Sequence, residues 1–386
     1  MINKLGLCGF KCFKNQQEFN LSKLNLFTGF NGRGKSTVFQ SLLMLAQSLY
    51  SNGTIEKLKI NGQFVRLGLF DDIISFDNTG ERVFFNIDSD IADIKTLELG
   101  YKELDDRNGI ICKLIANGVN CFTTKAEINA ERKTLSIHTS LANYPKESIE
   151  ILLSNFYYIS ADRLGPTMDE IKDDVLKDNP VGTKGEHRLI TLSSQVKTNG
   201  IRFNNKEKND EKSLIDEVNK WLNYIMDGAN IEIRGKEKEW SVLQLILNNV
   251  KAVNTGFGYS YILAIIVTAL IAPKGSCVFI ENPEAHLHPR AQARLTELLC
   301  KMAEFGIQVF IETHSEHIVN GARLASLKDE IDIKPKDISI HFFDEDYSVN
   351  PLKIEDNGQI LNWPEGFFDQ QEKDLSEILK NGLLKC

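Results

Sequence analysis

The amino-acid sequence predicts an α/β fold with an antiparallel β lobe near the N-terminus and a helical insertion in the middle. Two observations carry this prediction. Residues 256–326 read in turn as helix, strand, helix, strand and helix, an alternation typical of a parallel sheet flanked by helices. Residues 60–140 read as short strands, broken by Asn-Gly pairs that begin at positions 61, 108 and 117 and indicate turns between antiparallel strands.

Changes in pattern along the chain divide the 386 residues into four expected parts. They are an N-terminal lobe (1–140), a helical insertion (141–255), a C-terminal core (256–345) and a small C-terminal domain (346–386). The insertion is expected to be helical because stretches such as 208–228 have the spacing of amphipathic helices.

Composition narrows the class of protein. With 45 Lys and Arg against 53 Asp and Glu, the formal net charge is −8, which does not indicate nucleic acid as the main partner but leaves a local basic patch open. The apolar run at 261–272 is too short to span a bilayer and predicts a buried helix. No signal peptide is evident, and the seven cysteines include no CxxC pair. We therefore expect a cytoplasmic protein with reduced thiols and no membrane segment.

The stretch LFTGFNGRGKSTVFQSLLML (26–45) contains the pattern Gly29-x-x-x-x-Gly34-Lys35-Ser36. It follows an apolar strand and opens a helix, which is the context in which this pattern cradles phosphate with backbone N–H groups. Lys35 would reach the β- and γ-phosphates and Ser36 would ligate Mg²⁺. The residues expected to bind a nucleoside triphosphate here are Asn31, Gly32, Arg33, Gly34, Lys35, Ser36 and Thr37.

Two later strands are expected to end beside this loop. The apolar run 277–280 ends at Glu281, a carboxylate at the edge where parallel sheets place their ligands. About thirty residues on, a second run ends at Glu312-Thr313, and His314 follows where it could sense a γ-phosphate.

These motifs resemble the ABC-type branch of P-loop ATPases, which includes the SMC and DNA-repair ATPases and the bacterial OLD-like defence ATPases. The resemblance rests on ENPEAHLHP (281–289) and ETHS (312–315) and implies that Glu281 holds Mg²⁺ and that His314 is the switch histidine. Gly256-Phe257-Gly258 resembles the family's signature loop, with glycine in place of serine. The stretch 350–379 resembles a short C-terminal domain of unknown function found in one group of bacterial AAA-type, ABC-like ATPases.

The resemblance implies ATP and Mg²⁺ as cofactors and a homodimer in which Gly256 and Gly258 meet the ATP held by the other copy, with higher oligomers left open. It also implies a separate effector protein, a nuclease being one candidate, in bacterial antiviral defence or DNA metabolism. The family's catalytic glutamate is Asn282 here, and Glu284 is the nearby carboxylate that could replace it. Since an amide cannot accept a proton, we expect slow hydrolysis. The alternative is a non-hydrolysing ATP-binding scaffold or nucleotide sensor.

Other interpretations of single features stay open or are disfavoured. Arg163 could contact phosphate or a dimer partner, or be a buried structural arginine. His286, His288, His314 and His317 lack the spacing of a zinc site, so structural or switch roles are favoured. The acidic pieces 169–174 and 343–347 indicate solvated surface rather than nuclease carboxylates. The C-terminal segment could cover a sheet edge or dock a partner.

Overall fold

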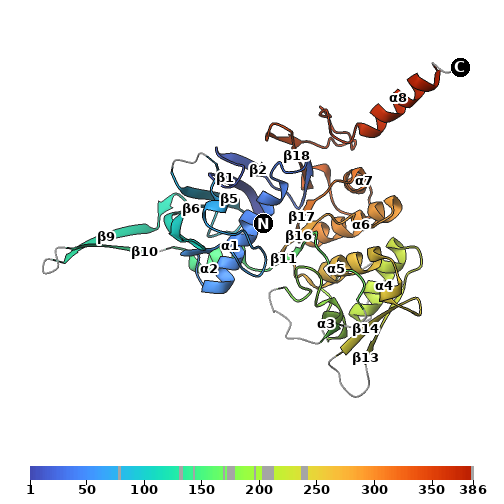
Figure 1. Ribbon diagram of the computed structural model, residues 1–386, viewed down its shortest axis with the longest axis horizontal. Coiled ribbons are helices and arrows are strands. Elements are labelled where there is room, and N and C mark those ends of the chain that lie inside the picture. The colour runs from blue at the N-terminus through green and yellow to red at the C-terminus, as the bar shows by residue number, and fades with distance from the viewer. Residues whose placement is uncertain are drawn as a thin grey trace.

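The computed structural model describes residues 1–76, 80–129, 134–141, 144–167, 170–171, 179–194, 197–201, 213–235 and 242–383. Its centre is a six-stranded core sheet in the order β11, β16, β17, β3, β18, β19, parallel except for the antiparallel edge strand β19 (Figure 1). The strands are β11 (Phe156–Ile159), β16 (Cys277–Glu281), β17 (Gln308–Glu312), β3 (Leu24–Gly29), β18 (Ile338–Phe343) and β19 (Val349–Leu352). The carboxyl ends of the parallel strands therefore meet at one edge, where parallel sheets place ligands.

A second sheet is antiparallel and built from the N-terminal part of the chain, as predicted. Its strands, in spatial order, are β2 (Gln17–Asn20), β1 (Ile2–Cys8), β5 (Arg82–Ser89), β6 (Thr96–Asp105), β7 (Asn108–Ala116) and β4 (Lys57–Lys59), with β8 (Val119–Asn120) paired to β7. A hairpin of β9 (Phe122–Asn129) and β10 (Thr134–Leu141) extends away from it on the left of Figure 1.

Eight helices and three short 3₁₀ turns complete the described chain. The helices are α1 (Lys35–Asn52), α2 (Lys146–Leu153), α3 (Arg188–Ser193), α4 (Leu214–Ile225), α5 (Phe257–Ile271), α6 (Pro289–Phe305), α7 (Glu316–Ala325) and α8 (Gln370–Leu383). The 3₁₀ turns are η1 (Asp71–Ile73), η2 (Ala252–Asn254) and η3 (Pro335–Asp337). Within the described residues no helix is both long and apolar enough to cross a membrane.

The core sheet separates two hydrophobic cores because its strands alternate side chains between two faces. In β3, Leu26 belongs to the core that α5, α6 and α7 cover, whereas Phe27 belongs to the core shared with α1 and the N-terminal sheet. Figure 1 shows α5, α6 and α7 to the right of the core strands and α1 to their left. Helix α1 is thus enclosed between two sheets and is buried on more than one face.

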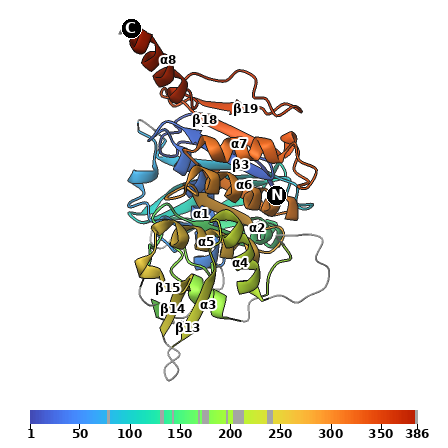
Figure 2. The same cartoon turned by 90° about the vertical axis from the view of Figure 1, so that its right-hand side faces the viewer.

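Residues 141–255, predicted as a helical insertion, are of mixed structure. They contain α2, α3 and α4 but also β11, which forms an edge of the core sheet. A small sheet of β12 (Glu170–Ile171), β14 (Val242–Leu247), β13 (Ile231–Gly235) and β15 (Val250–Lys251) lies at the bottom of Figure 2. Strand β11 was not predicted, because a buried run of four residues has no periodicity that distinguishes a strand from a helix.

The C-terminal segment first crosses the sheet edge and then leaves the body. After β19, Gly358 at φ 79° lies in a tight turn, and the backbone N–H of Glu355 donates to the carbonyl of Gln359 across it. Phe367 is buried against Phe342 of β18 and fixes the segment to the core. Helix α8 then stands away from the body (Figure 2), with its described side chains exposed.

Candidate nucleotide site

The loop between β3 and α1 has a shape that its glycines fix. Gly29 has φ 122°, and a Cβ there would lie 2.2 Å from the carbonyl oxygen of Phe343. Gly34 has φ 103°, and a Cβ there would lie 2.6 Å from Sγ of Cys12. Both the left-handed backbone and the close approach of neighbouring atoms exclude other residues at these two positions.

The amino end of α1 is left free to receive an anion. No side chain caps it and no acidic residue lies in its first turn, so its N–H groups and its dipole are uncompensated. Lys35 is buried in that turn and donates to the carbonyls of Gly29 and Phe30 at 3.1 and 2.7 Å. Burial lowers the pKa of Lys35, and Glu312 opposes this shift. A phosphate bound here would give the ammonium group an anionic partner.

The remaining loop residues are at or near the surface. Asn31 and Gly32 are exposed, and nothing lies within 4 Å of a Cβ placed at Gly32. The guanidinium of Arg33 lies 4.5 Å from the ring centre of Tyr347, and its Nε has no partner. Of the two hydroxyls in the first turn of α1, Thr37 is buried and Ser36 half-buried. The loop is therefore open on the side from which a nucleotide would approach.

Two carboxylates lie side by side at the ends of neighbouring strands. Glu281 and Glu312 are register partners in the parallel pair β16–β17, and an oxygen of Glu281 accepts from the Ala161 amide at 3.0 Å. The pKa of Glu312 is raised to about 7, chiefly by burial; the Ser36 hydroxyl and Lys35 act against this shift, and the neighbouring carboxylate of Glu281 adds to it. Glu312 was recognised as a strand end but not as a site residue. Its signal was available, because it is a carboxylate directly before His314.

The chain turns sharply after Glu281. Asn282 adopts φ 43°, a left-handed conformation that asparagine tolerates better than most residues. Its backbone N–H donates to the backbone carbonyl of Glu312 at 2.8 Å. Arg163 donates to the carbonyls of Glu281 and Asn282 at 2.8 and 2.5 Å and is only 3% exposed. Of the two roles considered for Arg163, this geometry supports the buried structural one, in which it positions the backbone that carries Glu281.

Glu284 connects this turn to the switch segment. Its two carboxylate oxygens accept from the Thr313 hydroxyl at 2.9 Å and from the His314 amide at 2.7 Å. Burial raises the pKa of Glu284 and lowers that of His314, which Lys35 lowers further. Glu284 is the carboxylate predicted as a possible replacement for the catalytic glutamate; Glu312, in register with Glu281, is a second carboxylate nearby. Both carboxylate oxygens of Glu284 are thus occupied by hydrogen bonds that hold the segment carrying His314.

The predicted signature residues lie at the start of α5. Gly256 is its N-cap, exposed and without a side-chain cap, and nothing lies within 4 Å of a Cβ placed there. Gly258 is buried, and a Cβ there would lie 2.6 Å from the carbonyl oxygen of His286. The exposed part of this helix end is therefore Gly256 with Phe257, whose side chain is 53% exposed.

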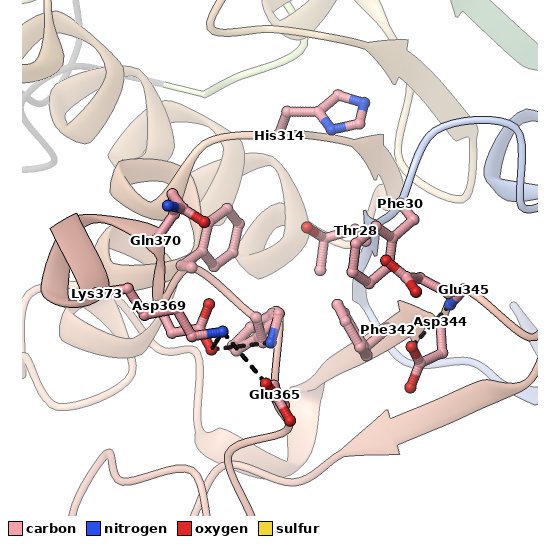
Figure 3. Close-up of a pocket in the computed structure, with 14 residues that line it drawn as sticks. Thr28, Phe30, His314, Phe342, Asp344, Glu345, Glu365, Asp369, Gln370 and Lys373 are labelled. Atoms are coloured by element: carbon pink, nitrogen blue, oxygen red, sulfur yellow. Dashed lines mark hydrogen bonds and ion pairs between the residues drawn. The ribbon is translucent and has the colours of Figure 1, made fainter.

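A cleft of about 820 Å³ adjoins the loop (Figure 3). One side is formed by Thr28, Gly29 and Phe30 with His314, and the other by the end of β18 and the C-terminal segment from Glu365 to Lys373. A Cβ at Gly366 would lie 2.7 Å from the Phe30 ring, so this segment packs directly on the loop. The segment therefore packs on β18 through Phe367 and also forms one wall of the candidate nucleotide site.

The histidines and acidic stretches outside the phosphate loop do not form a metal site in the described residues. Among the described residues no three His, Cys, Asp or Glu side chains form a metal cluster. His286 contacts the rings of Phe257 and Tyr261, and His288 caps α6 by accepting from the Arg290 amide. The acidic piece 343–347 is the end of β18 with the following turn, whereas most of 169–174 lies outside the described residues.

Comparison with known proteins agrees with this geometry. Residues 1–319 match the AAA ATPase domain family. The chain belongs to that family. Residues 333–378 match a protein family of unknown function, DUF3696, which confirms the predicted resemblance of the C-terminal segment. No curated protein matches the chain.

Three solved structures of SMC heads are similar to this family member. The SMC head bound to the C-winged helix domain of ScpA has a TM-score of 0.50 at 14% identity, covering 92% of this chain and 98% of that chain. The SMC head domain from Thermotoga maritima has a TM-score of 0.42 at 10% identity, covering 92% of this chain and 99% of that chain. A third structure is the Smc head domain with an extended coiled coil, bound to the C-terminal domain of ScpA derived from Pyrococcus furiosus. It has a TM-score of 0.46 at 12% identity, covering 98% of this chain and 99% of that chain. The first match confirms the predicted ABC-type fold; the roles of individual residues remain predictions.

Proposed function

We propose that this AAA ATPase domain protein is a nucleotide switch that binds ATP with Mg²⁺ between two copies of the chain and hydrolyses it slowly. The observation that carries the proposal is the convergence of four groups at one sheet edge. They are the uncapped amino end of α1, buried Lys35, the paired carboxylates Glu281 and Glu312, and His314. The negative charge of a triphosphate would interact directly with the amino end of α1 and with Lys35. A divalent cation bound to the triphosphate would interact with the two carboxylates.

The residues present suit a magnesium ion. Mg²⁺ commonly binds proteins through one or two carboxylates together with phosphate oxygens and water, so a cluster of three protein ligands is not required. Ser36 and Glu281 are the residues predicted to hold it. The buried oxygen of Glu312 that lacks a hydrogen-bond partner indicates an unmet charge at this place. When bound, Mg²⁺ would neutralise part of the phosphate charge.

Dimerisation is proposed from the exposure of the α5 amino end. This end is uncapped and free of acidic residues, so it offers N–H groups to an anion outside its own subunit. In the ATP-bound dimer, Gly256 and Gly258 of one copy would face the γ-phosphate held by Lys35 of the other. ATP binding would then favour the joined state, and hydrolysis or release would favour the separated state.

Slow turnover is proposed because Asn282 stands where a general base is expected and because both oxygens of Glu284 are already occupied. The second candidate function is a non-hydrolysing ATP scaffold or sensor, which Asn282 also favours. Phosphate release that Lys35→Ala abolishes would exclude that second function. A separate effector, with a nuclease as one candidate, and a role in bacterial antiviral defence or DNA metabolism belong to the same proposal and rest on the family resemblance alone.

Assembly provides the test. Sedimentation with a non-hydrolysable ATP analogue and Mg²⁺ should show a dimer that Gly256→Glu abolishes, since a side chain there has room in one subunit but would meet the partner's phosphate. Gly258 is unsuitable because a side chain would collide with its own subunit. Val119→Glu, at a residue 63% exposed on β8, is the matched control and should leave the dimer intact. A wild-type protein that stays monomeric with the analogue would contradict the dimer.

A further inference from the structure

We propose that Glu312 is a second carboxylate ligand of the divalent cation, acting beside Glu281 and Ser36. The inference rests on the proposed nucleotide site and adds to it the residue that determines how strongly the cation is held. It arises from the order of strands at the sheet edge and from an oxygen atom that has no partner.

The strand order places Glu312 between the other two predicted ligands. Strand β17 lies between β16, which ends at Glu281, and β3, which leads into the phosphate loop. Glu312 pairs in register with Glu281 on one side and with Phe27 on the other. Adjacent strands lie about 4.8 Å apart, so a cation held by Glu281 and by Ser36 on the loop side would lie over the end of β17.

The surroundings of Glu312 leave one of its two carboxylate oxygens without a protein partner. The residue is 8% exposed, and Oε2 is buried and makes no hydrogen bond. Lys35, the nearby cation, donates to two loop carbonyls, and among the described residues no ion pair joins it to Glu312. The Ser36 hydroxyl hydrogen-bonds to Glu312, and Ser36 is itself a predicted ligand. A buried carboxylate with an unsatisfied oxygen is costly, and a cation shared with Glu281 would offset that cost.

The competing explanation is structural, since Glu312 could serve only to orient Ser36. The two explanations differ in what removing the charge does. A glutamine retains the size of the side chain and its capacity to accept from Ser36, but it is a much poorer ligand for a hard cation. Glu312→Gln therefore separates charge from shape.

The experiment measures cation binding rather than turnover. Calorimetry gives the affinity of the full chain for a non-hydrolysable ATP analogue with EDTA and then with Mn²⁺, and electron paramagnetic resonance counts the Mn²⁺ bound with the analogue. We expect Glu312→Gln to keep the EDTA affinity and to lose at least about tenfold of the Mn²⁺-dependent gain, as Glu281→Gln should. Glu297→Gln on α6, a glutamate paired with Lys328, is the matched control and should keep the full gain.

Each other result has one meaning. If Glu312→Gln keeps the wild-type Mn²⁺ gain while Glu281→Gln loses it, the inference is overturned and the structural explanation stands. Glu312→Asp gives a second measurement should the glutamine variant fold poorly; it retains the charge on a shorter stem, and an unchanged Mn²⁺ affinity with an altered resonance spectrum would support the inference. If the wild-type chain binds no analogue with or without Mn²⁺, the proposed function fails and this inference fails with it.

Discussion

Replacing Asn282 by glutamate tests whether a missing base limits turnover. Asn282 directly follows Glu281 at the end of β16, and its Oδ1 atom is buried without a hydrogen-bond partner. A carboxylate here could accept a proton from the attacking water. A general base at the lower end of the usual range raises the rate about 10²-fold, which corresponds to about 2.7 kcal/mol of activation free energy.

The structure sets a cost against this gain. Asn282 has φ 43°, and residues other than glycine, asparagine and aspartate lose roughly 1–2 kcal/mol in the left-handed region. Asn282→Glu should therefore lower the free energy of unfolding by about that amount while raising kcat. Asn282→Gln carries a similar backbone cost without the carboxylate, so it should lose stability and gain no rate. Denaturant unfolding and steady-state phosphate release measure the two effects separately.

Glu284→Gln completes the comparison. Glu284 holds the segment of His314 by two hydrogen bonds, so the amide should slow hydrolysis by misplacing His314 rather than by removing a base. If Glu284 were the base, Glu284→Gln would abolish phosphate release and Asn282→Glu would change little. If Asn282→Glu folds but releases phosphate no faster than Asn282→Gln, the reasoning on the missing base is refuted.

Three further predictions concern stability. Arg163→Ala removes a buried guanidinium from the carbonyls of Glu281 and Asn282 and should lower the free energy of unfolding by about 3 kcal/mol, measured in urea, with Arg163→Lys recovering part of it. Phe367→Ala should cost about 3–5 kcal/mol locally and expose the C-terminal segment to protease; equal cleavage rates in wild type and variant would contradict this. Burial lowers the pKa of His341 to about 4. Between about pH 4 and pH 6.5 this histidine is therefore mostly protonated in the unfolded chain and mostly neutral in the folded chain. Stability from His341 is present above pH 6.5 and lost as the pH falls towards 4, by about 2 kcal/mol at pH 5, and His341→Phe should remove that loss.

The phosphate loop and its neighbouring strands could be predicted because their signals are local. A strand that ends in a glycine-rich turn before a helix permits few other structures, and the strand ends at Glu281 and Glu312 were read from short apolar runs. Helix α1 shows the limit of such reasoning. The spacing of the apolar residues at 38, 42, 45 and 49 indicates one buried face, but the helix lies between two sheets and is buried on several faces. The apolar periodicity of a helix shows that one face is buried, but not whether a second sheet also packs against the opposite face.

Other features depend on pairings that sequence order does not contain. Asn117-Gly118 forms the turn that its two residues predict, with both at positive φ. Asn108-Gly109, the same pair, forms the first two residues of β7, and Asp106-Arg107 forms the turn instead. The role of Arg163 was ambiguous in the sequence because two of the backbone carbonyls that it binds, those of Glu281 and Asn282, are more than 100 residues away. The pairing of Glu281 with Glu312 likewise requires the strand order.

The central claim is that the loop after β3 holds the phosphates of ATP, and calorimetry on Lys35 variants tests it most directly. Lys35→Ala removes the ammonium group, and Lys35→Met removes the charge while keeping most of the buried stem; thermal unfolding without nucleotide checks that both variants fold. The account predicts that both lose at least about tenfold in ATP affinity, equivalent to about 1.4 kcal/mol. Folded variants that bind ATP as tightly as the wild type would contradict it.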